Sequence, residues 1–202
     1  TADNYCVKYL EPHGKDQVLY LNYKAEIYRR VFGVHIYNMK YTTLNMNSKF
    51  LIKYRQLFYP DGKKTVSEQI LNMLSPKAIA IWHCDDGSIS ACRVELATDC
   101  FGYEGNILIQ KWFKEKYDIN FILTIDRRNS EHFKYSLRTN KLEETYKFIN
   151  LIKNYVPDCM KYKVDIEYNL TKKRNNLKSY WYKNRDKLIE RIKNIKILVK
   201  SM

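Results

Sequence analysis

Residues 74–87 read LSPKAIAIWHCDDG and predict a short helix that carries a pair of carboxylates at its end. Ser75 is a favourable N-cap, and Pro76 fits the first helical turn because its missing N–H is not needed there. Gly87 is predicted to end the helix in the left-handed conformation, which glycine adopts without steric cost. Because the helix is apolar on nearly all sides, we expect other elements to cover more than one of its faces.

The residues after this helix alternate between strand and helix patterns. The predicted order is a strand at 90–98, a helix at 104–117, strands at 119–125 and 133–137, and a helix at 141–155. This order favours one antiparallel sheet with helices on one face, an α+β layer. The opposite face of the sheet is polar, which indicates either an ordinary solvated face or a surface that lies on nucleic acid.

A similar pattern occurs earlier in the chain. Residues 50–66 and 148–164 each contain an apolar helix that a Pro-Asp pair stops, followed by lysines and a valine, and the two prolines are 97 residues apart. Upstream of the first copy lie strand-like residues at 5–10 and 34–46, with a helix predicted at 17–32. This predicts a duplicated α+β unit, the alternative being a chance likeness of two amphipathic helices. The first copy of the 74–87 helix is not in the sequence.

The charge of the chain is large and unevenly distributed. The 202 residues carry a formal charge of +14, and residues 171–202 hold eleven basic and two acidic residues. A polyanion such as nucleic acid is the expected partner, because phosphate neutralisation releases counterions. A merely soluble basic surface is the alternative. With 45 % apolar residues the chain is not of a disordered class, and its apolar runs are too short for a membrane helix, so no membrane partner is expected.

Residues 74–87 resemble the second motif of LAGLIDADG homing endonucleases of the double-motif organellar type, which often reads L-[ST]-P-x-x-L-A-x-W-x-x-D-D-G. The resemblance covers residues 60–168 well and residues 1–59 weakly. Further landmarks agree in order: the turn from Thr98 to Glu104, the helix that ends at residues 114–117, and Pro157 followed by Met160, Tyr162 and Lys163.

The resemblance implies a fold class and a division of the chain. The fold expected is α+β, with two pseudo-symmetric LAGLIDADG-type units, each an antiparallel β-saddle with helices on one face. The first unit is expected to be incomplete, and a basic helical extension follows the second. The corresponding segments are a partial first unit at 1–66, the unit with the motif helix at 67–168, and the basic tail at 169–202.

The resemblance also implies a catalytic centre. In the family, two motif helices pack about a pseudo-twofold axis, and their last acidic residues bind divalent metal ions for phosphodiester cleavage. Oxygen ligands suit Mg²⁺, which holds the scissile phosphate against the attacking water. By this resemblance Asp86 is a catalytic residue and the metal ligand. Lys64 and Lys163 match the basic residues near the active centre, where they polarise water or stabilise developing charge.

Two departures from the family pattern weaken the enzymatic interpretation. The first motif is absent, so one of the two facing carboxylates is missing, and a single Asp cannot build a two-sided metal site. The gap between Gly87 and the strand at Ser90 is short, whereas the family has a long hairpin here that reaches into the major groove. A hairpin this short allows contacts with the phosphates and the shape of the nucleic acid, which position a protein without reading the base sequence.

The favoured function is therefore a degenerate copy that binds structured RNA, such as intron or ribosomal RNA, with ribonucleoprotein partners such as a mitochondrial ribosome. The alternative is an active, Mg²⁺-dependent, site-specific DNA endonuclease whose first motif lies upstream or in a partner chain. Mg²⁺ is expected as a cofactor only in that case, and whether the chain is an enzyme stays open.

The residues expected to bind nucleic acid lie on the polar sheet face and in the basic tail. They are Arg93, Lys134, Arg138, Lys172, Lys173, Arg174, Lys178, Lys183, Arg185 and Arg191. The abundance of Lys, Asn, Ile and Tyr is typical of an AT-rich genome and gives a soft indication of a mitochondrial or other organellar origin.

Overall fold

A computed structural model shows that the chain folds into two compact units. Unit 1 comprises Thr1–Val66 with Pro157–Met160, and unit 2 comprises Ser67–Val156 and the residues from Lys161 onward. The expected boundary at residues 168 and 169 stays a prediction. The structure describes residues 6–32, 37–39, 43–90, 92–126, 133–171, 187, 189–191 and 193–194.

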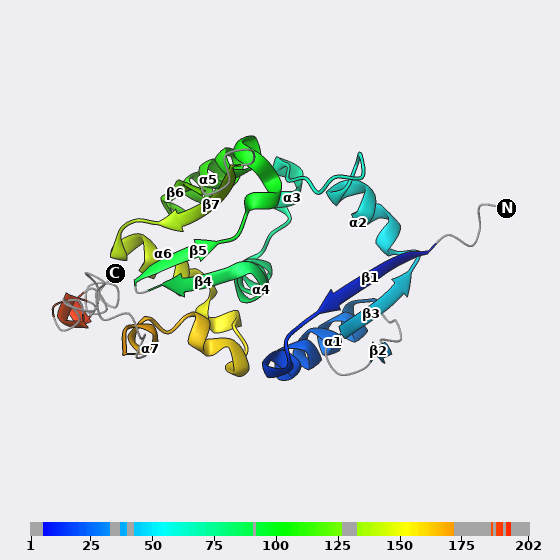
Figure 1. The fold of residues 1–202 in the computed structure, drawn as a ribbon, viewed down its shortest axis with the longest axis horizontal. Coiled ribbons are helices and arrows are strands. Elements are labelled where there is room, and N and C mark those ends of the chain that lie inside the picture. Colours follow the sequence, from blue (N-terminus) through cyan, green and yellow to red (C-terminus); the bar gives the residue numbers. More distant parts are fainter. Residues whose placement is uncertain are drawn as a thin grey trace. The chain divides into compact units, whose positions relative to one another are not determined.

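Unit 1 contains a three-stranded antiparallel sheet and two main helices (Figure 1). The sheet order is β1-β3-β2, and its longest pairing runs from Val7 opposite Ser48 to Pro12 opposite Thr43. The elements in chain order are β1 (Val7–Pro12), η1 (Lys15–Gln17), α1 (Val18–Phe32), β2 (Tyr37–Met39), β3 (Thr43–Ser48) and α2 (Leu51–Phe58).

The core of unit 1 lies between the sheet and its helices. Leu21 and Ala25 of α1 pack with Leu44 of β3, while Leu51 of α2 packs with Met46. These buried positions follow from the helical spacing of the apolar residues in α1 and from the two-residue period of β3. The first repeat therefore has its own small hydrophobic core.

Unit 2 contains a four-stranded antiparallel sheet of order β4-β5-β7-β6. The elements before and within the sheet are α3 (Glu68–Asn72), α4 (Pro76–Asp86), β4 (Gly87–Ser90), β5 (Arg93–Leu96), η2 (Asp99–Phe101), α5 (Gly102–Tyr117), β6 (Phe121–Asp126) and β7 (Lys134–Thr139). The elements after it are α6 (Leu142–Ile152), η3 (Lys153–Tyr155), η4 (Asp158–Lys163) and α7 (Ile166–Thr171).

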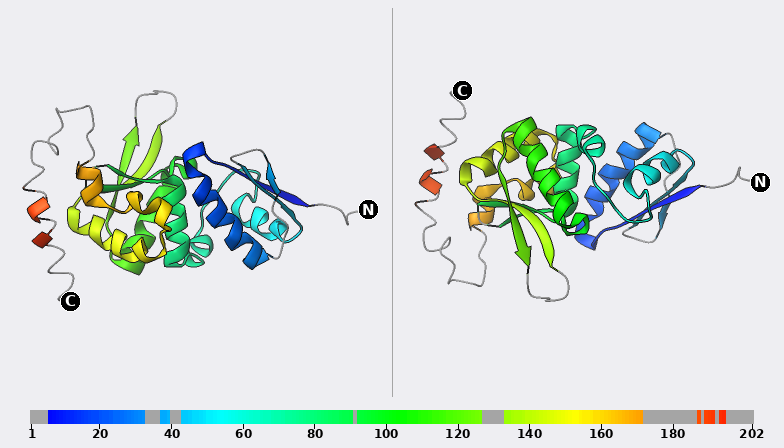
Figure 2. Two further views of the ribbon diagram at one scale, coloured as in Figure 1. Left: turned by 90° about the horizontal axis from the view of Figure 1, so that it is seen from below. Right: turned by 90° about the horizontal axis from the view of Figure 1, so that it is seen from above.

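The helices of unit 2 cover the apolar face of its sheet. Phe113 of α5 packs on Phe121 of β6 with ring centroids 4.9 Å apart, and Phe121 in turn meets Phe148 of α6 at 5.6 Å. Val94 and Leu137 are fully buried beneath these helices. In both views of Figure 2 the outer ends of β6 and β7 project beyond the helical layer.

The two units share one topology, which confirms the predicted α+β class with a repeated, incomplete first unit. The order β1-β3-β2 in unit 1 matches β5-β7-β6 in unit 2. In each unit one helix follows the first of these strands and another follows the last, α1 and α2 in unit 1 and α5 and α6 in unit 2. Among the described residues of unit 1, nothing corresponds to α4 and β4.

The strand predicted at residues 90–98 is present as β5, with shorter bounds. A second short strand, β4, precedes it, and the two pair as a hairpin from Gly87 opposite Leu96 to Ser90 opposite Arg93. The alternating pattern was correctly placed, because Cys92, Val94 and Leu96 are buried, but β4 begins directly at the end of α4. The hairpin is short, as the spacing predicted.

Little of the basic tail lies within the described residues. Lys187, residues 189–191 and residues 193–194 are helical, and the rest of the expected helical extension after residue 171 lies outside the described part of the chain. Among the described helices, none combines the length and the apolar character that crossing a membrane requires.

Candidate metal site and nucleic-acid interface

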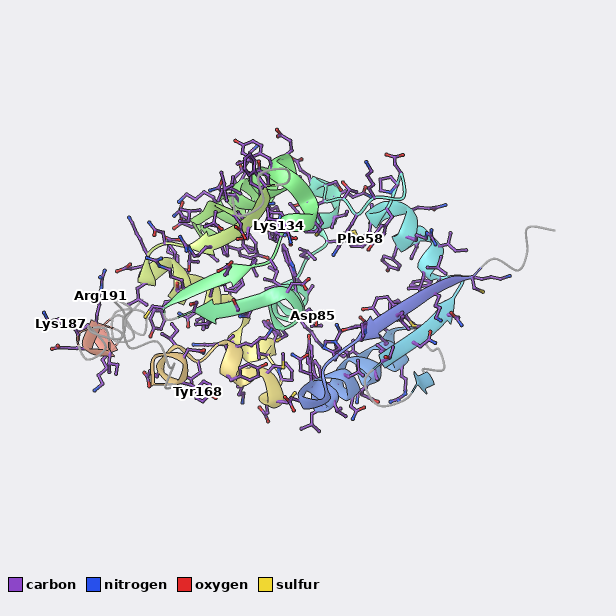
Figure 3. All side chains as sticks on the ribbon, viewed as in Figure 1. Phe58, Asp85, Lys134, Tyr168, Lys187 and Arg191 are labelled. Carbon is purple, nitrogen blue, oxygen red and sulfur yellow. The ribbon has the colours of Figure 1, made fainter. Side chains whose placement is uncertain are left out.

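Helix α4 begins as the sequence predicted and presents a carboxylate at its end. The Ser75 hydroxyl accepts a hydrogen bond from the Ala78 N–H at 3.3 Å. At the other end Asp86 is exposed, and its backbone carbonyl accepts a hydrogen bond from the Ala97 N–H at 3.0 Å. Figure 3 labels the neighbouring Asp85, which is partly exposed. Asp86 therefore lies on solvent-accessible but well-supported backbone between α4 and β4.

Gly87 does not end α4 in the left-handed conformation, so that prediction is wrong. Its backbone is extended, with φ −97° and ψ 159°, a conformation open to any residue. Glycine is required here for a different reason: a Cβ atom would lie 2.0 Å from Nδ1 of His83 and 2.5 Å from the His83 carbonyl oxygen. The histidine ring therefore packs directly against the glycine backbone.

His83 is completely buried and links α4 to the segment around Lys163. Its Nε2 lies 2.9 Å from the Lys163 carbonyl oxygen. A carbonyl can only accept, so Nε2 carries the proton and the neutral ring leaves Nδ1 bare. Nδ1 makes no hydrogen bond within the described part of the chain, and the ring meets Phe148 edge-on at 5.4 Å. Burial lowers the pKa of His83 to about 4, so the ring is neutral at physiological pH.

The side chain of Lys163 contacts the backbone at the end of α4. Its ammonium group donates hydrogen bonds to the carbonyl oxygens of Cys84 at 2.6 Å and Gly87 at 2.9 Å. Lysine is favourable at a helix C-terminus because the last carbonyls lack helical partners and carry partial negative charge. Burial lowers the pKa of Lys163, and the Asp85 and Asp86 carboxylates partly oppose that shift. The structure thus places this ammonium on helix carbonyls, and its expected action on water stays a prediction.

The sequence did not reveal the pairing of His83 with Lys163. The two residues are eighty positions apart, and no local pattern connects them. The one available signal was the spacing of His83 and Gly87, four residues apart on a helix, which places the ring beside a residue without a side chain.

The end of α4 suits a hard divalent cation through its donor atoms. The exposed Asp86 carboxylate, with Asp85 beside it in sequence, offers oxygen ligands, and the helix C-terminus favours positive charge. The second helix end that a two-sided site needs has no counterpart among the described residues of unit 1. The third expected catalytic residue, Lys64, is exposed in unit 1, where it lines an apolar groove of about 780 Å³ with Phe58 and Gly62.

Three expected nucleic-acid contacts share the polar face of the unit 2 sheet. Arg93 of β5 and Arg138 of β7 are partly exposed, and Lys134 of β7 is exposed. Arg138 stands opposite Glu95, and Lys134 stands opposite Asp126. These acids, which stand opposite the cations on neighbouring strands, make the face only mildly basic.

The remaining expected contacts belong to the tail. Lys172, Lys173, Arg174, Lys178, Lys183 and Arg185 lie outside the described residues. Arg191 is described and exposed, and its guanidinium donates a hydrogen bond to the Glu143 carboxylate of α6 at 2.8 Å. This contact brings the described part of the tail to α6, while a role of Arg191 in nucleic-acid binding stays a prediction.

Comparisons with known proteins place this geometry in one family. The chain is 30 % identical to Protein RecA of Mycolicibacterium flavescens over 118 residues, 53 % of this chain and 26 % of that protein. It is 28 % identical to DNA endonuclease I-ChuI of Chlamydomonas applanata over 133 residues, 61 % of this chain and 59 % of the enzyme. It is 29 % identical to Cytochrome b mRNA maturase bI2 of Saccharomyces cerevisiae over 101 residues, 50 % of this chain and 23 % of the maturase.

The chain thus spans less than two thirds of each of these relatives. Its fold resembles that of the homing endonuclease I-WcaI, solved bound to its DNA recognition sequence, with a TM-score of 0.61 and 16 % identity over 81 % of this chain and 76 % of that one. The sequence model of the LAGLIDADG DNA endonuclease family matches residues 2–145, well over half of the sequence. The chain therefore belongs to the LAGLIDADG DNA endonuclease family.

Proposed function

We propose that the chain binds duplex DNA through the polar face of the β4-β5-β7-β6 sheet and contributes Asp86 to a metal-dependent endonuclease centre. The observation that carries the proposal is the exposed Asp86 carboxylate at the end of a helix whose Cys84 and Asp86 carbonyls accept hydrogen bonds from Lys163 and Ala97. I-ChuI is named as a DNA endonuclease and I-WcaI was solved on DNA, and both names support DNA as the partner.

Each group of this chain has a distinct task in the proposal. Asp86 provides an oxygen ligand, while Arg138 and Lys134 on the sheet bind the phosphate backbone and set the register of the duplex. A divalent cation bound at such a site polarises the phosphate and lowers the pKa of a bound water. A second carboxylate has to come from outside the described part of unit 1, which contains no helix equivalent to α4.

Cleavage assays with matched variants test the endonuclease proposal. The chain, together with the first motif helix or the partner chain that supplies the second carboxylate, is incubated with Mg²⁺ and supercoiled plasmid libraries, and nicked or linear products are separated on gels. We expect site-specific nicking that Asp86→Asn abolishes and that Asp99→Asn retains, because Asp99 is an exposed acid of the same unit that lies outside α4. Nicking that survives Asp86→Asn would exclude Asp86 as the ligand.

Structured RNA is the second candidate, and two observations favour it. The β4-β5 hairpin is short, so it offers little reach into a major groove, and a relative is named as a cytochrome b mRNA maturase. RNA helices are recognised through phosphates, 2′-hydroxyls and shape, and a mildly basic face suits such contacts. In that case the chain needs no metal, and its partners include ribonucleoproteins such as an organellar ribosome.

Competition binding distinguishes the two candidates. A duplex DNA and a structured RNA of equal length are titrated against the chain over a series of salt concentrations, because phosphate contacts weaken linearly with the logarithm of salt. Preferential retention of RNA, with crosslinks at the tail lysines, would replace the DNA proposal by the RNA one. An organellar origin accords with the residue composition and with the maturase relative, and it remains part of the proposal.

A further inference from the structure

Two residues eighty positions apart hold each other at the end of α4. The His83 ring donates to the backbone carbonyl of Lys163 at 2.9 Å, and the Lys163 ammonium donates to the carbonyls of Cys84 and Gly87. The Gly87 N–H in turn donates to the His83 carbonyl. We call these contacts the α4 clamp: the His83 ring binds the backbone of Lys163, and the Lys163 ammonium binds the backbone at the end of α4.

Asp86 lies inside the α4 clamp. The carbonyls that Lys163 binds belong to Cys84, two residues before Asp86, and to Gly87, the residue directly after it. The Asp86 carbonyl itself is held by the Ala97 N–H. The backbone on both sides of the carboxylate is therefore restrained, and the direction of its side chain depends on these restraints.

From this geometry we infer that His83 is a positioning residue for the Asp86 carboxylate, acting through the Lys163 backbone and ammonium. The inference rests on the proposed role of Asp86 as a metal ligand. His83 suits the task because its ring fills the space between Phe148 and Gly87 while one nitrogen donates to Lys163. A leucine fills similar space without donating, whereas a glutamine donates without being a ring.

Terbium luminescence tests the inference without requiring cleavage. Tb³⁺ is a hard cation that prefers oxygen ligands, and tryptophan excitation sensitises its emission at short range. Trp82 stands one helical turn before Asp86 and serves as the sensitiser. The full chain is titrated with Tb³⁺ as wild type, His83→Leu, His83→Gln and Asp86→Asn, with Asp99→Asn as the matched acidic control. All titrations are run at neutral pH, where His83 is uncharged, so the His83 variants leave the local charge unchanged.

We expect Asp86→Asn to abolish the emission and Asp99→Asn to leave it unchanged. His83→Leu should weaken Tb³⁺ binding by about 10- to 100-fold, the usual effect of removing a group that orients a ligand. His83→Gln should recover much of that loss because its amide can donate to the Lys163 carbonyl. If wild type and His83→Leu bind Tb³⁺ with equal affinity while Asp86→Asn loses binding, the inference about His83 is overturned but the metal site is supported.

Hydrogen exchange separates failure of the clamp from failure of the metal site. The amides of Gly87 and Ala97 donate to His83 and Asp86, so their exchange rates report the restraint directly. If Asp86→Asn does not alter the Tb³⁺ emission, the metal proposal fails, and the positioning role of His83 fails with it. In that case, faster exchange at both amides in His83→Leu, with the wild-type rate restored in His83→Gln, would show that the clamp restrains the backbone but has no role in metal binding. Unchanged exchange in His83→Leu would overturn the clamp itself.

Discussion

Replacing Gly87 by alanine tests whether close packing, rather than backbone conformation, requires the glycine. The backbone of Gly87 is extended, so an alanine there has no conformational penalty. On backbone entropy alone, a glycine-to-alanine change at such a position stabilises a protein by about 0.4–1 kcal/mol. The alanine Cβ, however, would lie 2.0 Å from His83 Nδ1 and 2.7 Å from its Cγ, so the ring must move.

The magnitude follows from what that movement costs. Forcing an extra carbon into a packed site costs about 1–3 kcal/mol. Moving the ring also breaks its hydrogen bond to the Lys163 carbonyl, worth about 1 kcal/mol. After subtraction of the entropic gain, Gly87→Ala should lower the free energy of unfolding of unit 2 by about 2 kcal/mol. The sign is thus opposite to that expected from backbone entropy.

Tryptophan fluorescence during urea unfolding measures this change. Trp82 and Trp112 belong to unit 2, and a Trp181→Phe background removes the third tryptophan. A second test places Gly87→Ala in a His83→Ala background, where only the ring's share of the cost should disappear, because the Cβ still lies 2.5 Å from the His83 carbonyl oxygen. A neutral or stabilising Gly87→Ala in the wild-type background would refute the packing argument.

Three further predictions concern other parts of unit 2. Because the pKa of His83 is lowered to about 4, the unfolded chain binds a proton there at a higher pH than the folded chain does. The free energy of unfolding of unit 2 should therefore fall by up to about 3 kcal/mol as the pH falls from 6.5 to 4. Urea unfolding at several pH values measures this loss, which should be smaller in His83→Leu. Arg138→Ala should weaken duplex binding about equally for all sequences and reduce the salt slope by about 1, in titrations where Lys111→Ala, on the helical side of the sheet, changes little. Thr145→Val should cost about 1–3 kcal/mol in urea unfolding, because the buried Thr145 hydroxyl donates to the Cys92 carbonyl at 2.8 Å.

Local sequence signals predicted most of the fold of unit 2. The Ser75 cap and Pro76 located the start of α4, and the apolar stripe located α5 to within two residues at its start. These signals succeed because a helix cap or a periodic stripe is contained within a few neighbouring residues. The repeat was also visible, since the helix-Pro-Asp pattern recurs and the strand orders of the two units agree.

The errors occurred where distant residues meet. The role of Gly87 depends on the ring of His83, which is held in turn by Lys163 from the other end of unit 2. The β5-β7 pairing likewise depends on Thr139, whose hydroxyl accepts a hydrogen bond from the Val94 N–H at 3.0 Å across the sheet. Such contacts depend on tertiary packing and leave no local pattern. The sequence therefore assigned to Gly87 the commonest role of a glycine at a helix end, the left-handed conformation.

The position of Lys163 also changes what a lysine variant can prove about catalysis. Removing its charge near Asp86 has two opposite effects on cation binding: it releases the α4 clamp, which weakens binding, and it removes a like charge, which strengthens it. Two unit charges about 5 Å apart interact by about 3 kcal/mol at an effective dielectric constant of about 20, comparable to the loss from misplacing a ligand. An inactive Lys163→Met variant therefore does not identify a catalytic lysine. Salt separates the two effects, because added ions screen the charge term at this partly exposed site while the hydrogen-bonded clamp is unaffected.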